Sequence, residues 1–180
     1  IKAGLCVAGT RSVGCFDAFE TAVRTVLGQQ ITVKAAQTLA ARFINALGTP
    51  FETGTAFPAP EKIAGLPEQS LIDLGIMPTR AKAISAIAKG VSDATIDLSP
   101  AADPKTEIPK LLALPGVGPW TANYLAIRTM RVRDAFLDAD FGVKKALAPM
   151  TAAEIKAVKE KCRPFGSYAT FNLWNSLPPI

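Results

Sequence analysis

The chemistry open to this chain is limited first by a residue type that it lacks. The sequence of 180 residues contains no histidine, which excludes Ser-His-Asp and Cys-His nucleophile systems, histidine general bases and metal sites that need imidazole. Its three cysteines, Cys6, Cys15 and Cys162, show no CxxC spacing and are too few for a Cys₄ zinc site or an iron–sulfur cubane. Unpatterned thiols of this kind are typical of a reduced, cytosolic protein. Proton transfer must therefore fall to carboxylates, lysine, tyrosine or cysteine.

The segment 111–122 has the most features that could bind a ligand. It reads Leu-Leu-Ala-Leu-Pro-Gly-Val-Gly-Pro-Trp-Thr-Ala, in which a turn joins two apolar helices and Pro119 occupies the first position of the second helix. Gly116 and Gly118 have no Cβ, so another backbone or a phosphate could come close to their N–H groups. Those groups lie beside a helix N-terminus, where the dipole favours an anion. The segment predicts either a phosphate-binding hairpin or a tight helix–helix turn without a ligand.

Asp140 is an acidic residue placed at the start of a predicted helix. It follows an irregular stretch, 131–139, and precedes a short helix that we expect to run through Leu147. An aspartate at this position can cap the N-terminus of the helix. A cap position also points the carboxylate outward from the helix end, so capping and catalysis are compatible. The residue type alone leaves both interpretations open.

Helical spacing dominates the elements that must hold these residues. Apolar residues recur at intervals of three and four from about residue 16 to Gln30 and again over 33–47. The segment Thr151-Ala152-Ala153-Glu154 is a capping box that begins a further helix. The stretch 48–59 is predicted to be a loop, and no segment alternates with period two for long enough to require a strand. The sequence predicts an all-α fold of about ten short helices.

Together, the hairpin and Asp140 resemble the helix-hairpin-helix DNA glycosylase superfamily, which pairs this hairpin with a Gly/Pro-rich loop and a downstream aspartate. The spacing from the hairpin to Asp140 matches that of the family. Other segments are similar to the bacterial 3-methyladenine DNA glycosylase II family, namely 16–20, 27–30, 120–124 and 167–169 with Trp174. The resemblance extends from about Gly14 to Trp174.

The resemblance implies a bilobal bundle with a cleft between the lobes, and residues 1–180 would form one glycosylase core. We expect a first helical lobe over 15–132, with the helix-hairpin-helix at 104–130. A second lobe would cover 133–180 and be completed by 1–14. The resembled enzymes begin with a β-containing domain of which this chain shows nothing, so we expect the chain to be part of a longer polypeptide.

The resemblance also implies an activity, which is the repair of alkylated DNA. An enzyme of this family flips an alkylated purine of the 3-methyladenine type out of duplex DNA and hydrolyses the N-glycosidic bond, which leaves an abasic site. Asp140 would be the catalytic residue, because a carboxylate stabilises positive charge on the sugar and can activate water. The base pocket would be formed by Trp120, Tyr124, Phe141 and Trp174, although each could instead be ordinary core packing. Bifunctional members carry a lysine at the position of Trp120, so the resemblance implies a monofunctional enzyme without lyase activity.

Contacts with the DNA backbone are likewise implied by position. Gln30 lies where the family has a leucine that fills the gap left by the flipped base, although it could equally be a polar residue at a helix end. Phosphate contacts are assigned to Gly116, Gly118 and Thr121. The backbone carbonyls of Leu112, Leu114 and Val117 would hold a structural metal ion at the hairpin. The chemistry itself is expected to need no cofactor and no iron–sulfur cluster.

The expected partner is duplex DNA that contains alkylated bases. The formal net charge of +5 is compatible with an anionic partner but does not establish one. No uncharged stretch could span a bilayer, so we expect no membrane association. We expect a monomer in the bacterial cytoplasm, associated with the nucleoid. Two alternatives remain, which are a non-catalytic helix-hairpin-helix module of a larger repair or regulatory protein, and a helical interaction domain with a purely structural hairpin.

Overall fold

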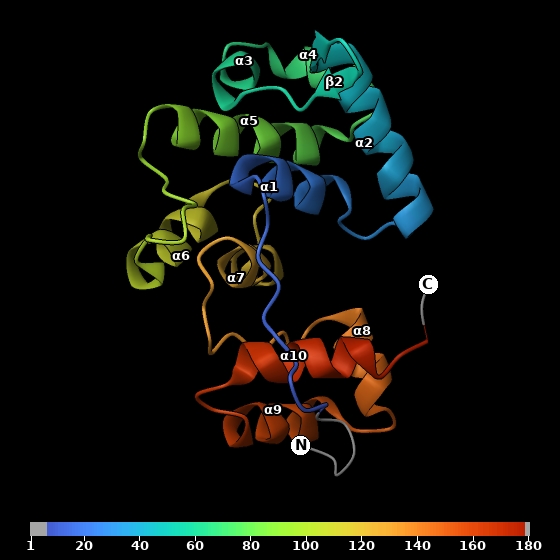
Figure 1. Cartoon of the computed structure of the whole chain (residues 1–180), viewed down its shortest axis with the longest axis vertical. Helices are drawn as coiled ribbons and strands as arrows, with labels where there is room; N and C mark the ends of the chain where they lie inside the picture. The colour runs from blue at the N-terminus through green and yellow to red at the C-terminus, as the bar shows by residue number, and fades with distance from the viewer. Residues whose placement is uncertain (1–6, 179–180) are drawn as a thin grey trace.

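The computed structural model describes residues 7–178 as a stack of short helices (Figure 1). Cys6 and the first part of the segment expected to complete the second lobe, 1–6, lie outside the described residues. Within the described part, the helices are α1 (Ala18–Leu27), α2 (Val33–Leu47), α3 (Pro60–Ala64), α4 (Glu68–Ile72), α5 (Pro78–Ser92), α6 (Pro104–Ala113), α7 (Pro119–Arg128), α8 (Phe141–Leu147), α9 (Ala152–Lys161) and α10 (Gly166–Asn175). The predicted helical fold class is confirmed.

Local capping explains where several of these helices begin. The Asp17 carboxylate accepts a hydrogen bond from the Glu20 backbone N–H at 2.7 Å and so caps α1. The capping box predicted at α9 is present, because Thr151 and Glu154 bond each other's backbone N–H groups. These bonds, from the Thr151 backbone and then from its hydroxyl, lower the pKa of Glu154 below its usual value.

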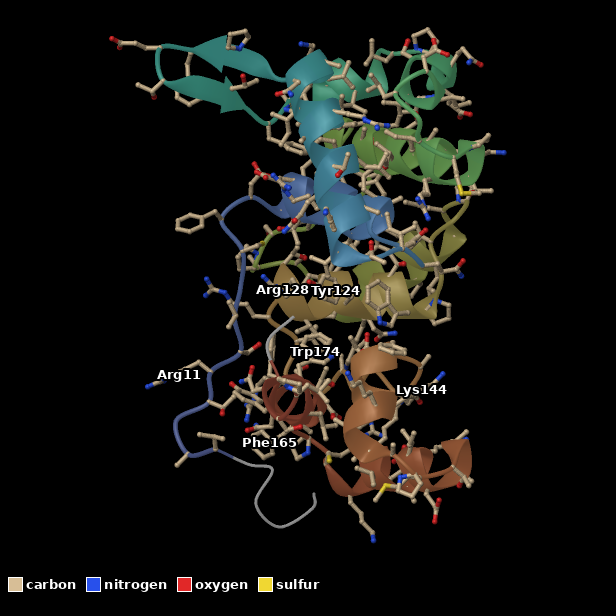
Figure 2. All side chains as sticks on the ribbon, turned by 90° about the vertical axis from the view of Figure 1, so that its right-hand side faces the viewer. Arg11, Tyr124, Arg128, Lys144, Phe165 and Trp174 are labelled. Atoms are coloured by element: carbon tan, nitrogen blue, oxygen red, sulfur yellow. The ribbon has the colours of Figure 1, made fainter. Side chains whose placement is uncertain are left out.

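A small antiparallel hairpin corrects the expectation of a loop over 48–59. Strand β1 (Thr49–Phe51) pairs with β2 (Gly54–Ala56), with Thr49 opposite Ala56. Three residues per strand are too few for a period-two pattern to be visible in the sequence, and all six residues are exposed. The hairpin projects from the end of α2, far from the segment 111–122 (Figures 1 and 2).

The larger hydrophobic core surrounds α5. This helix packs against α1, α3 and α4 (Figure 1), because Ile84, Ile87 and Ala88 follow helical spacing and are completely buried. Leu111 and Leu125 join the same core from α6 and α7. The helical hairpin 111–122 is therefore held in place by side chains that are buried in this core.

A second core holds the other end of the molecule together. Val143, Leu147, Ile155 and Leu173 bring α8, α9 and α10 into one cluster. A third, smaller cluster includes Ile127, Ala135, Leu137 and Phe171, against which Trp120, Tyr124 and Trp174 pack. Three of the four aromatic residues singled out in the sequence, all but Phe141, therefore lie at the seam between the two main cores.

The segment 7–16 runs from the start of α1 past α7 to α10 (Figure 1), and we call it the strap. The side-chain oxygen of Asn172, on α10, accepts hydrogen bonds from the Val7 backbone N–H at 2.9 Å and from the Thr10 hydroxyl at 3.1 Å. Asn172 is only 6% exposed. The strap therefore ties the beginning of the described chain to its last helix. Among the helices of residues 7–178, none is long and apolar enough to cross a membrane.

Candidate active site

The turn between α6 and α7 is shaped by a glycine in the left-handed region. Gly116 has φ +74°, and a Cβ there would lie 2.8 Å from the Thr79 carbonyl oxygen and 3.1 Å from the Ala83 Cβ. A glycine is required here because α5 comes so close to the turn. This packing holds the turn against the larger core. Gly118, by contrast, faces open space, since no atom lies within 4 Å of the position that a Cβ would take. Both glycines are exposed, and Gly118 is the one that faces open space where a Cβ would lie.

Gln29 links this turn to the loop between α1 and α2. Its side-chain amide donates to the Gly116 carbonyl at 3.1 Å and to the Thr121 hydroxyl at 2.9 Å. The backbone carbonyl of Gln29 in turn accepts a hydrogen bond from Arg80, which is buried on α5. This network holds the exposed Gln30, whose φ is +54°, at a fixed place beside the hairpin.

Thr121 is 3% exposed, so its hydroxyl contributes to this network rather than to the surface. It lies in the first turn of α7, where backbone N–H groups have no partner within the helix. A phosphate contact at Thr121 would thus be made by the backbone N–H. The sequence did not predict that Gln29 and Arg80 support the hairpin, because these contacts join distant positions. Gln29 and Thr121 are 92 residues apart, and Arg80 and Gln29 are 51 residues apart.

Asp140 is the N-cap of α8 and accepts three hydrogen bonds. Its Oδ1 accepts from the Val143 backbone N–H at 2.9 Å and from the Trp174 indole N–H at 2.8 Å. Its Oδ2 accepts from the Trp120 indole N–H at 2.9 Å. The structure therefore brings two distant residues to Asp140. Trp120 on α7 is 20 positions from it in the sequence, and Trp174 on α10 is 34 positions from it. The carboxylate is half-buried and held on both oxygens.

The aromatic rings form a continuous row behind this carboxylate. Trp120 and Tyr124 stack with their centroids 5.1 Å apart, one turn apart on α7. Tyr124 contacts the Trp174 ring at 6.1 Å, and Phe171 meets Trp174 edge to face at 5.4 Å. Figure 2 shows Tyr124 and Trp174 on facing elements at the seam. Phe141, which was expected in the pocket, is 79% exposed and lies outside this row.

A cation borders the row at its other end. The Arg128 guanidinium lies 5.8 Å from the centroid of the Tyr124 ring, and its Nη1 is 3.5 Å from the tyrosine hydroxyl (Figure 2). Contacts of this kind between a cation and an aromatic face are attractive. Trp120, Tyr124 and Arg128 therefore form one stripe along α7, at intervals of four residues.

The hairpin carbonyls fit a small hard cation by their chemistry. Leu112 and Leu114 lie at the C-terminal end of α6, where the helix dipole is negative, and carbonyl oxygen is a ligand that such cations accept. The Leu114 carbonyl accepts the Val117 N–H at 3.3 Å and keeps a second lone pair. Among the described residues, no group of three or more Cys, Asp or Glu side chains is arranged to hold a metal ion.

The fold and the site define a class of helical proteins in which a helix-hairpin-helix is paired with an aspartate at a neighbouring helix N-terminus. The model of the HhH-GPD superfamily of base excision DNA repair proteins matches residues 23–165, and the chain belongs to this superfamily.

Particular relatives are similar over most of the chain. DNA-3-methyladenine glycosylase 2 of Escherichia coli is 35% identical over an alignment of 176 residues, which covers 96% of this chain and 62% of the relative. A probable bifunctional transcriptional activator and DNA repair enzyme of Mycobacterium tuberculosis is 36% identical over 94% of this chain and 35% of its own length. The chain thus spans less than two thirds of these relatives.

The fold is also found in solved structures. The Schizosaccharomyces pombe 3-methyladenine DNA glycosylase, solved in complex with abasic DNA, superposes with a TM-score of 0.75 at 23% identity. The match covers 93% of this chain and 84% of that one. This similarity concerns the arrangement of the helices.

Proposed function

We propose that this protein is a DNA glycosylase that removes alkylated purines of the 3-methyladenine type from duplex DNA. The observation that carries the proposal is the Asp140 carboxylate, held by the indole N–H groups of Trp120 and Trp174 at 2.9 and 2.8 Å beside a row of aromatic rings. Relatives that are named as 3-methyladenine glycosylases support the same substrate class.

The aromatic row suits a cationic, planar base. A purine methylated at N3 carries a positive charge, and electron-rich ring faces attract such a charge. Flipping the nucleotide out of the duplex would bring the base to Trp120, Tyr124 and Trp174. The hairpin would hold the flanking phosphate at the open Gly118 and at the backbone N–H of Thr121. Gln30 would occupy the space that the base leaves, and a metal ion held by Leu112, Leu114 and Val117 would add positive charge near the phosphate.

Asp140 would then act on the sugar. As the bond between C1′ and the purine nitrogen breaks, its electron pair neutralises the cationic base, and positive charge develops on the deoxyribose. The fixed carboxylate stabilises that charge and orients a water molecule toward C1′. The water forms the new C1′–O bond and releases a proton to the carboxylate or to solvent. The products are a neutral methylated purine and an abasic site.

The direct test is to incubate the protein with methylated duplex DNA and to identify any released base by mass spectrometry. We expect 3-methyladenine or a related methylated purine. Duplex binding without base release would instead support the non-catalytic module, and the absence of both would support an interaction domain.

Asp140→Asn tests the role of the carboxylate. We expect the excision rate to fall by roughly 10²–10⁴-fold, because an amide cannot balance the charge on the sugar. Binding to a duplex with an abasic-site analogue should change little, which would show that the variant is folded. Asp138→Asn is the matched control, since Asp138 pairs with Lys159 at 3.0 Å and is partly exposed. An Asp140→Asn variant with normal activity would contradict the mechanism.

A further inference from the structure

A glycine in the first turn of α8 lies where a side chain would collide with the site. Gly142 is the second residue of the helix, two positions after Asp140. A Cβ on Gly142 would lie 2.9 Å from Trp174 Cδ1 and 3.1 Å from both Trp174 Nε1 and Asp140 Oδ1. These are the two atoms that form the 2.8 Å hydrogen bond. A Cβ at position 142 would therefore lie closer to both atoms of this hydrogen bond than an ordinary van der Waals contact of 3.4–4 Å.

The backbone conformation does not explain this glycine. Gly142 lies inside a helix, and the glycines with positive φ in the described chain are Gly9, Gly75 and Gly116. Alanine favours a helix over glycine at such a position. The reason for a glycine is therefore the approach of the Trp174 indole to the helix end.

The indole has little freedom to move away from an added methyl group. Phe171, which is 6% exposed, meets the Trp174 ring edge to face at 5.4 Å. Tyr124 borders the same ring at 6.1 Å and is itself stacked on Trp120. To restore an ordinary contact of 3.4–4 Å with a Cβ at 142, the indole would have to disturb these neighbours or withdraw from Asp140.

We propose that Gly142 is a positioning residue for base excision: its missing Cβ lets the Trp174 indole N–H hold Asp140 Oδ1 in a fixed orientation. The inference rests on the proposed glycosylase activity and deepens it. In this arrangement Trp174 has two separate tasks, since its ring face borders the base and its N–H aims the carboxylate. Orientation errors of an ångström at a reacting group can lower a rate by about 10²-fold.

The test compares Gly142→Ala with Gly65→Ala, a matched control. A Cβ on Gly65 would meet nothing closer than the Glu61 carbonyl oxygen at 3.6 Å, at a helix end far from Asp140. We expect Gly142→Ala to lower the single-turnover excision rate by about tenfold and to leave the Kd for an abasic-analogue duplex within about twofold. Gly65→Ala should change neither quantity. An unchanged rate in Gly142→Ala would overturn the inference.

A second measurement reads the hydrogen bond without any substrate. The chain contains two tryptophans, so an amide-type ¹H–¹⁵N spectrum of the full protein should show two indole signals. Trp174→Phe, which keeps a ring face and removes the N–H, identifies the Trp174 signal. Gly142→Ala should move that signal strongly and the Trp120 signal weakly. If both signals stay in place, the inference fails whether or not the protein releases bases.

A double variant separates positioning from general damage. If Gly142 acts through the indole N–H, then adding Gly142→Ala to Trp174→Phe should lower the excision rate by much less than tenfold. Equal, multiplying effects of the two changes would show that Gly142 acts by another route and would overturn the inference. Failure of the proposed function gives a different pattern, in which the unchanged protein releases no base although the indole signals respond as expected.

Discussion

At the scale of single residues, Trp120 is the side chain that bears on whether the proposed glycosylase would cut the strand as well as release a base. Its indole N–H is bound to Asp140 Oδ2 at 2.9 Å, so an indole occupies the hairpin position beside the carboxylate. A covalent imine with C1′ needs an amine. The lysines nearest in sequence to Asp140, Lys144 and Lys145, are exposed on α8. For the proposed glycosylase we therefore expect hydrolysis without a lyase step.

Borohydride trapping tests this point. We expect no covalent adduct between the protein and a methylated duplex in the presence of borohydride, because reduction can only trap an imine. The measurement is a denaturing gel, with base release followed in parallel so that an inactive sample is recognised. A retained adduct would contradict a monofunctional enzyme. Comparing Lys144→Ala and Lys145→Ala would then locate the amine.

The residues of the site differ in how far the sequence could reveal them. Asp140 could be predicted as a helix cap because the signal is local. The contact between Gly142 and Trp174 could not, because it joins residues 32 positions apart and depends on how α8 and α10 pack. A glycine inside a seven-residue helix was the available signal. Phe141 stays a predicted pocket wall, and the structure places it exposed at the start of α8.

At the scale of elements, the two hairpin glycines have different tasks. Gly116 is required by the fold, since its φ is +74° and α5 approaches it closely. Gly118 is the N-cap of α7 with φ −93°, and its surroundings are open. The sequence motif could not distinguish the two glycines, because the difference depends on where α5 packs in the folded protein.

This difference predicts opposite outcomes for two alanine variants. Gly116→Ala should lower the free energy of unfolding by about 1–3 kcal/mol, because alanine is strained at positive φ and its Cβ meets the Thr79 carbonyl. Gly118→Ala should cost less than about 1 kcal/mol but weaken duplex binding. Urea unfolding and fluorescence anisotropy measure the two effects. If Gly118→Ala binds DNA normally, the proposed phosphate contact is wrong.

Elements were predictable where a cap or a period marks them, as for α9 with its Thr151–Glu154 box. The hairpin of β1 and β2 was not, since strands of three exposed residues bury no face and leave no alternation. The link from Gln29 to the hairpin was also hidden, because an amide side chain in a loop gives no hint of a partner 87 or 92 residues away.

The strap is a feature of the whole molecule, and it depends on one buried side chain. Asn172→Ala removes the acceptor for the Val7 N–H and the Thr10 hydroxyl and should lower the free energy of unfolding by about 1–3 kcal/mol. It should also release the strap, so that trypsin cleaves after the exposed Arg11 (Figure 2) at a higher rate than in the unchanged protein.

Asn175→Ala provides the control for the strap, because Asn175 is exposed at the end of the same helix. Mass spectrometry of the first tryptic fragments would follow cleavage after Arg11. Equal cleavage rates in Asn172→Ala and Asn175→Ala would show that the strap is held by other contacts.

The path of the strap has a mechanical consequence. The polypeptide crosses the seam once in the strap and again between α7 and α8, so the end of the molecule that contains α8, α9 and α10 is pinned at two points (Figure 1). The two ends are also joined by side chains, since Ile127 of α7 and Phe171 of α10 lie in one buried cluster and Trp120 bonds Asp140. Two chain crossings and this packed interface together fix Asp140 and Trp174 in place relative to Trp120.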